Sequence, residues 1–170
     1  QTLGKPHPDY AGSLNNLAIL YQSMGVYARA ERLLLESKSI REQTLGKQDP
    51  DYARSLNNPA ELYFAMEDYP QAKTLYLESK AIRQQTLGRQ HPDFALSLHC
   101  LARLYRSMGD YARAEPLFRE AVEITVNHLE QTSAIQSEEQ QMLMIGSVRY
   151  QLDNYLGCCL EGGLGQRNAV

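Results

Sequence analysis

The chain has 170 residues, which is long enough to bury a substantial core and suits one domain. Its 17 basic and 20 acidic residues give a net charge of −3, and this excludes a broad basic surface for nucleic-acid phosphates. No apolar run approaches the ~18 residues that span a bilayer. Three cysteines, Cys100, Cys158 and Cys159, lack metal-ligand spacing. We therefore expect a cytoplasmic protein with reduced thiols and no metal site.

A repeat with a period of 42 residues organises most of the sequence. QTLGK begins at residues 1 and 43, and QTLGR begins at residue 85. Each is followed by Pro-Asp-aromatic, then by SLNNLAILY, SLNNPAELY or SLHCLARLY, and then by YARAERLLLES, YPQAKTLYLES or YARAEPLFREA. Segments of this length at constant spacing indicate an array of repeats. Because Gln1 opens inside a linker motif, we expect a further repeat upstream.

Each repeat predicts two helices. In the first repeat, apolar residues recur at helical spacing over residues 14–21 and again over residues 27–40. Prolines at 8, 50 and 92 fit the first helical turn, and the aspartate after each places negative charge at the positive end of the helix dipole. Gly25 and Gly109 permit a tight turn between the helices, and Gly46 and Gly88 fit the end of the second helix.

The second repeat departs from this pattern at two positions. Pro59 stands where the other repeats have Leu17 and Leu101, and it removes the hydrogen bond to the carbonyl of Ser55. We predict a kink there, at a cost of about 3 kcal/mol. Glu67 replaces the turn glycine, so the usual turn geometry is in doubt at that position.

A different segment follows Ile124. Residues 137–140 match a capping box, which predicts the start of another helix. Its predicted apolar stripe consists of Met142, Ile145, Val148, Leu152, Tyr155 or Leu156, and Cys159. We expect a capping segment over residues 129–161 that covers the last repeat, and a mobile tail over residues 162–170.

The pattern Leu17-Ala18, Tyr21, Gly25, Tyr27, Ala30, Leu34, Ser37 resembles the tetratricopeptide repeat. The longer 42-residue form, with its LGKxHPD connection, resembles the repeats of kinesin light chains and their bacterial relatives. This resemblance implies an all-α fold, a right-handed superhelical array of antiparallel helix hairpins, with three repeats over residues 1–128. Residues 133–156 are similar to the segment that precedes caspase-like CHAT peptidase domains in bacterial repeat proteins.

The first helices of such an array line its concave face, where ligands usually bind. By resemblance, the asparagines at equivalent positions, Asn16 and Asn58, pair with the backbone of an extended peptide. Arg103 and Arg106 could hold an acidic side chain or a carboxylate. The full set of predicted peptide-binding residues is Asn16, Asn58, Glu61, Phe64, His99, Arg103 and Arg106. Alternatively, these polar residues only solvate the face, and the asparagines hold neighbouring repeats together.

Three functions fit these features. The first is a protein-protein interaction module that binds a peptide or protein segment in the groove of the first helices. The others are a homotypic scaffold that self-associates through exposed repeat ends, and the regulatory arm of a larger protein such as a CHAT-type peptidase. We expect neither catalysis nor a cofactor, because no nucleophile, base and orienting group can be assembled from the spacing.

Overall fold

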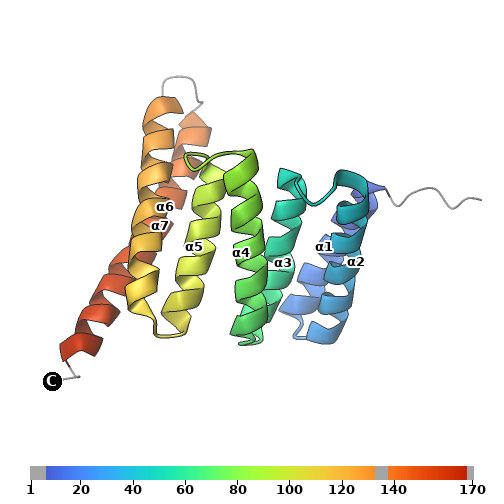
Figure 1. Cartoon of the computed structure of the whole chain (residues 1–170), viewed down its shortest axis with the longest axis horizontal. Helices are drawn as coiled ribbons and strands as arrows, with labels where there is room; N and C mark the ends of the chain where they lie inside the picture. Colours follow the sequence, from blue (N-terminus) through green and yellow to red (C-terminus); the bar gives the residue numbers. More distant parts are fainter. Residues whose placement is uncertain (1–6, 133–137, 168–170) are drawn as a thin grey trace, which may run out of the picture. The chain divides into compact units, whose positions relative to one another are not determined.

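This computed structural model describes residues 7–132 and 138–167, which form seven α-helices and no strand (Figure 1). The helices are α1 (Pro8–Ser23), α2 (Tyr27–Leu45), α3 (Pro50–Ala65), α4 (Tyr69–Thr86), α5 (Pro92–Ser107), α6 (Tyr111–Thr132) and α7 (Glu138–Arg167). The first six form the three predicted hairpins, which confirms that fold class. None of the described helices is long and apolar enough to cross a membrane.

The chain divides into two compact units, residues 1–86 with α1–α4 and residues 87–170 with α5–α7. This boundary follows the second repeat. The predicted division into repeats at 1–128, a cap at 129–161 and a tail at 162–170 stays a prediction. Helix α7 continues to Arg167, past the predicted start of the tail.

The first helix of every hairpin begins at the predicted proline and has a capping side chain before it. His7, Asp49 and His91 each accept a hydrogen bond from the backbone N–H two residues later, at 3.2, 2.7 and 3.1 Å. These bonds satisfy one of the N–H groups that a helix start leaves without an intrahelical acceptor. The two histidines that flank helix starts in the sequence therefore have a capping role.

All three turns within the hairpins have the same geometry. Gly25 and Gly109 both have φ 74°, and Glu67 has φ 60°. In each turn, the residue with positive φ donates its backbone N–H to the carbonyl of the residue three positions earlier. The residue after it donates its N–H to the carbonyl five positions before itself, and all these distances are 2.8–3.0 Å. The turn geometry that the sequence left in doubt is thus kept at Glu67, in a backbone conformation that side chains other than glycine rarely adopt.

In the first unit, apolar clusters form within each hairpin and between the two hairpins. Leu62 of α3 packs with Ala18 of α1 and with Ala30 and Leu34 of α2. Buried serines reinforce each hairpin: Ser37 Oγ donates to the carbonyl of Ala11 at 2.8 Å, and Ser79 Oγ donates to that of Ala53 at 2.9 Å. Helix α3 runs unbroken through the buried Pro59, and the kink stays a prediction.

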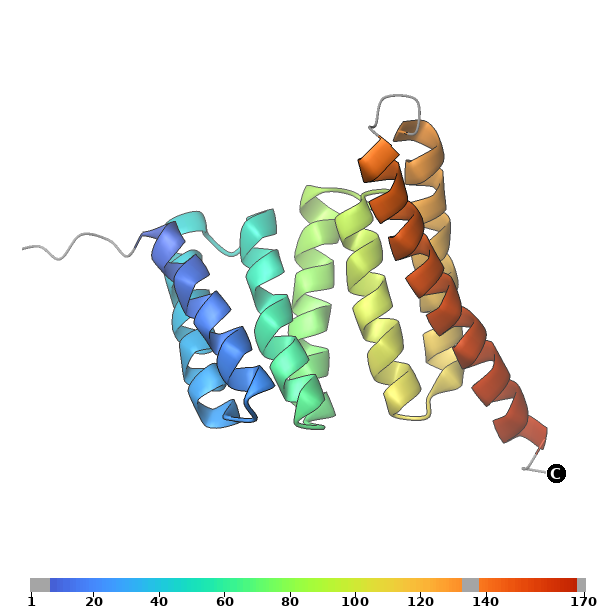
Figure 2. The same ribbon diagram turned by 180° about the vertical axis from the view of Figure 1, so that it is seen from behind.

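In the second unit, α7 packs on α6 and closes the open side of the last hairpin (Figure 2). Its buried Cys158 joins a cluster that contains Ala102, Ala114 and Phe118. Gln151 is also buried, and it accepts a hydrogen bond from the Thr125 hydroxyl at 3.1 Å.

The predicted apolar stripe of α7 is therefore only partly correct. Half-buried Val148 and Tyr155 face the core together with Gln151 and Cys158, whereas Met142, Ile145, Leu152, Leu156 and Cys159 are exposed. The packed face is rotated because α6 presents polar partners, Thr125 and Glu115, that Gln151 and Tyr155 meet. The helix begins at Glu138, and Ser137 of the predicted capping box lies outside the described residues.

Candidate protein-binding surface

An asparagine pair links the two first helices of the first unit. Asn58 of α3 donates its amide N–H to the side-chain oxygen of Asn15 of α1. This contact fits the alternative interpretation, in which the asparagines hold neighbouring repeats together. It uses one N–H and one oxygen, so the Asn58 oxygen and the Asn15 amide hydrogens still offer an acceptor beside a donor. A peptide bond presents the complementary pair.

Four other residues complete this surface, which we call the α1/α3 surface. Asn16 and Ile19 of α1 are exposed, with half of the Ile19 side chain accessible. Glu61 of α3 accepts a hydrogen bond from the Tyr76 hydroxyl of α4 at 2.6 Å, which fixes its carboxylate. Phe64 is half-buried and lies beside Tyr69, with 6.0 Å between the ring centroids.

A tyrosine-glutamate pair stabilises the packing beneath the α1/α3 surface. The Tyr63 hydroxyl of α3 donates to Glu31 of α2 at 2.7 Å. Burial and the Glu31 carboxylate raise the pKa of Tyr63 to about 12, so it remains a neutral donor at physiological pH. This bond and the asparagine pair join the same two hairpins, which keeps α1 and α3 in a fixed register.

In the second unit, the structure places His99 where a peptide cannot reach it. His99 is 3% exposed, and its ring lies 5.3 Å from that of Phe118 and 5.4 Å from that of Tyr150, centroid to centroid. Burial, with a smaller effect from Arg103, lowers its pKa to about 4. His99 is therefore a neutral interior residue, and the predicted peptide contact at this position does not fit.

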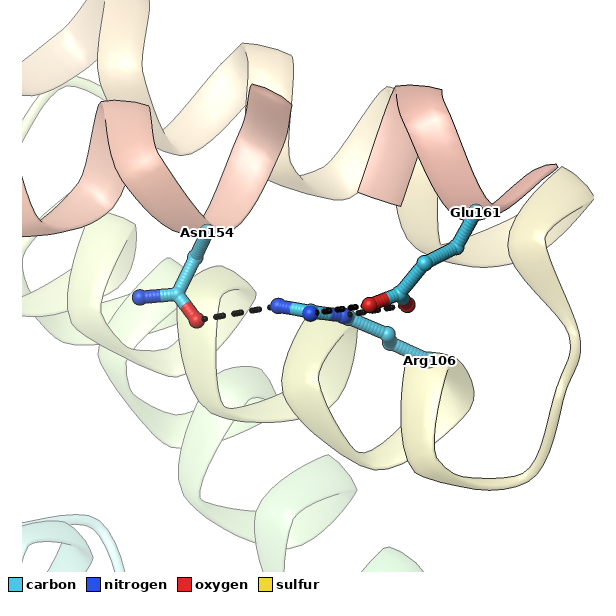
Figure 3. A network of polar contacts seen from close by, with 3 residues as sticks. All are labelled: Arg106, Asn154 and Glu161. Atoms are coloured by element: carbon cyan, nitrogen blue, oxygen red, sulfur yellow. Dashed lines mark hydrogen bonds and ion pairs between the residues drawn. The ribbon is translucent and has the colours of Figure 1, made fainter. Parts of the chain in front are cut away.

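Arg106 also faces α7 (Figure 3). Its guanidinium donates to both carboxylate oxygens of Glu161, at 2.8 and 2.5 Å, and to the side-chain oxygen of Asn154 at 3.4 Å. A carbon placed on the α-carbon of Gly157 would lie 3.1 Å from this guanidinium, so the glycine permits the close approach. The predicted role in holding a ligand's acidic group does not fit, because a carboxylate of the chain already holds Arg106. Arg103 is half-buried on α5.

Helix α7 occupies the position of a first helix relative to the hairpin before it. The Tyr155 hydroxyl donates to Glu115 at 3.3 Å, as Tyr63 does to Glu31, and Glu115 follows Glu31 by two repeat periods. The same correspondence holds for a second pair. His99 lies two repeat periods after Asn15, and it contacts Tyr150 of α7 in the way that Asn15 contacts Asn58 of α3. In both pairs, the residue of α7 lies 92 positions after its counterpart in α3. The sequence pattern hid this relation because 92 is not a multiple of 42.

The tetratricopeptide repeat family model matches residues 9–79 and 60–125. The chain belongs to the tetratricopeptide repeat family.

Solved structures share the fold of this tetratricopeptide repeat chain. BtubC (BKLC) from P. vanneervenii matches with TM-score 0.66 at 22% identity over 98% of this chain and 66% of its own. A kinesin light chain-like protein of Podosopora anserina, with nearly identical TPR-like repeats, matches with TM-score 0.61 at 21% identity over 89% of this chain and 96% of its own. A substituted variant of that protein matches with the same TM-score at 20% identity, over 95% and 99% of the two chains. No curated protein has a matching sequence.

The family model confirms the predicted family, and the solved structures share its fold. The tetratricopeptide repeat is a protein-interaction fold, so a general role in protein-protein interaction follows from membership. The chain spans about two thirds of the length of BtubC.

Proposed function

We propose that this tetratricopeptide repeat chain binds an extended protein segment on its α1/α3 surface and acts by binding rather than by catalysis. The observation that carries this proposal is the Asn15–Asn58 pair, which spans two repeats and offers a donor beside an acceptor. A peptide lying across α1 and α3 can satisfy both with one of its backbone amide groups. Backbone recognition of this kind gives affinity that depends little on the ligand's side chains.

The surroundings of the asparagine pair supply side-chain selectivity. Ile19 and Phe64 offer apolar contact on α1 and α3, and Asn16 adds an exposed amide. Glu61, fixed by Tyr76, favours a donor or a positive charge on the ligand nearby. Because both helices are packed before the ligand arrives, binding requires little ordering of the protein.

The prediction of an acidic ligand stays with Arg103 of the second unit, which, like Arg106, already has an interaction within the chain. We keep Arg103 as a candidate contact for a ligand carboxylate in the second unit. This part of the proposal is separate from the α1/α3 surface, and a charge-reversing substitution tests it independently.

The test is binding of the whole chain to an array of extended peptides of mixed charge, followed by titration of the best binders in solution. Asn58→Ala and Asn15→Ala should each weaken binding about tenfold, as expected for the loss of a ligand hydrogen bond with its desolvated partner. Arg103→Glu should weaken acidic peptides selectively. The matched control is Asn127→Ala, which truncates an exposed asparagine on α6.

Asn58→Ala also removes a contact between hairpins, so its folding must be checked by circular dichroism and thermal unfolding. A folded Asn58→Ala protein that binds as wild type does, or an array without binders, would refute the α1/α3 surface as a ligand site. Loss of binding in Asn127→Ala as well would show that the array reports non-specific adhesion.

A regulatory role within a larger protein stays a prediction, as does the similarity of residues 133–156 to a segment before CHAT peptidase domains. Cytoplasmic location also stays a prediction. It is consistent with the three free cysteines, two of which are buried.

A further inference from the structure

Helix α7 has a second apolar face that its own unit leaves uncovered, and we call it the outer face. Met142, Ile145, Leu152, Leu156 and Leu160 are 68, 50, 38, 55 and 69% exposed. Their spacing of three, four and seven residues places them on one side of the helix, away from Gln151 and Cys158. A contiguous apolar stripe of this length on a helix marks an interaction surface.

The register of α7 explains why this face is open. With the offset of 92 residues, Ile145 and Leu152 correspond to Ala53 and Ala60 of α3, which are fully buried. Ala53 packs with Ile82 of α4, the second helix of its hairpin. Cys159 corresponds to the turn residue Glu67, yet α7 continues as helix through that position to Arg167. Among the described residues, no second helix returns to cover the outer face.

An apolar groove between α6 and α7 borders the outer face. Its volume is about 270 Å³, and its lining includes Val122 and Val126 of α6 and Leu152 and Tyr155 of α7. Leu152 belongs to both the groove and the outer face, so the two form one continuous apolar surface.

The charges on this side of α7 are complementary to those of a second α7. Arg149 and Asp153 are both exposed, and neither has an ion-pair partner within the part of the chain that the structure describes. If two copies lie antiparallel with a two-fold axis at the level of residue 151, Arg149 of each faces Asp153 of the other. The same axis sets Met142 opposite Leu160, and Leu156 opposite Gly146. A β-carbon added at Gly146 would meet no described residue within 4 Å apart from the adjacent backbone of its own helix.

We propose that the outer face of α7 binds the same face of a second copy of this chain, antiparallel and with two-fold symmetry. Such an isologous contact closes on itself and gives a dimer rather than a filament. The five apolar side chains of both copies bury roughly 1,000 Å², which lies at the low end for specific interfaces. The expected dimer is therefore weak, with a dissociation constant in the micromolar range. It does not depend on the α1/α3 surface, which belongs to the other unit.

Sedimentation of the full chain over a wide concentration range tests this proposal. The wild type should pass from monomer to dimer, and Leu156→Glu should weaken the dimer at least about tenfold, as expected for an interface anchor. The matched control is Leu143→Glu, because Leu143 is 71% exposed but lies outside the outer face. That variant should dimerise as wild type does.

A charge exchange tests the antiparallel register. Arg149→Asp and Asp153→Arg should each weaken the dimer by placing like charges together, and the double variant should restore it. Circular dichroism confirms that α7 stays helical in each variant. A chain that remains monomeric at all concentrations, a dimer unaffected by Leu156→Glu, or a double variant that fails to restore association would overturn the proposal. Sensitivity to Leu20→Glu on α1 instead would place the contact elsewhere and would overturn it as well.

Discussion

Protonation of His99 is expected to make the second unit markedly less stable in acid. The imidazole is 3% exposed, and its two ring nitrogens have no hydrogen-bond partner among the residues that the structure describes. Phe118 and Tyr150 surround the ring with aromatic faces and edges. A charge at this position would lose its hydration without gaining a partner, and nearby Arg103 would repel it.

The magnitude follows from the difference between the pKa of His99 in the folded chain, about 4, and its ordinary value of 6.5. Between these pH values the unfolded chain binds a proton that the folded chain does not, so the free energy of unfolding falls as the pH falls. At 1.36 kcal/mol for each pKa unit, the total loss is about 3 kcal/mol. It is complete below about pH 4, where both states are protonated. This is a large part of the stability of a small domain.

Urea unfolding of wild type and His99→Phe at a series of pH values between about 4 and 7.5 measures this effect. Phenylalanine keeps a ring against Phe118 and Tyr150 but cannot titrate. All other titrating groups contribute equally to both proteins, so the difference between the two curves isolates His99. Near neutral pH the variant should be at least as stable as wild type, because it buries no polar nitrogen without a partner.

Parallel curves for the two proteins would refute this reasoning. So would an NMR titration in which the His99 imidazole protonates near its ordinary pKa.

The turn at Glu67 should become more stable by about 1 kcal/mol in Glu67→Gly, because glycine relieves the positive φ and the change removes a negative charge from a helix C-terminus. Thermal unfolding measures this gain in stability. Glu67→Gln removes the charge but keeps the side chain, so it should give only a small part of the gain. Gly12→Ala should stabilise α1 by about 1 kcal/mol in the same assay, since a methyl group at this helical position meets nothing within 4 Å; an unchanged melting temperature would contradict this. Glu161→Gln should release the end of α7 by about 1 kcal/mol, a modest value because the Glu161 side chain is 41% exposed. Faster hydrogen exchange over residues 157–165, with exchange unchanged in α1–α4, is the expected readout.

Local features of the hairpins could be predicted from the sequence because they depend on residues close together in the chain. Prolines at helix starts, positive-φ glycines at turns and apolar residues at helical spacing fixed the six helices of the repeats. The 42-residue period then identified the family. Even the turn at Glu67 follows this logic, since the flanking helices impose the conformation that glycine adopts elsewhere.

The candidate site depended on contacts between residues far apart in sequence. Repeat position alone grouped His99 and Arg106 with Asn58 as peptide-binding residues. In the structure, α7 packs over the third hairpin, where Tyr150 covers His99 and Glu161 binds Arg106. Asn58 meets Asn15 rather than standing free. No local pattern contains this information.

The orientation of α7 was also decided by tertiary structure. Two apolar stripes run along this helix, and a hydrophobic pattern cannot show which one packs inward. The choice rests on polar partners, since Gln151 meets Thr125 and Tyr155 meets Glu115. The sequence by itself determined the helices, their caps and turns, and the repeat family. Only the tertiary structure decided which side chains remain on the surface, because burial depends on the neighbour that packs against each helix.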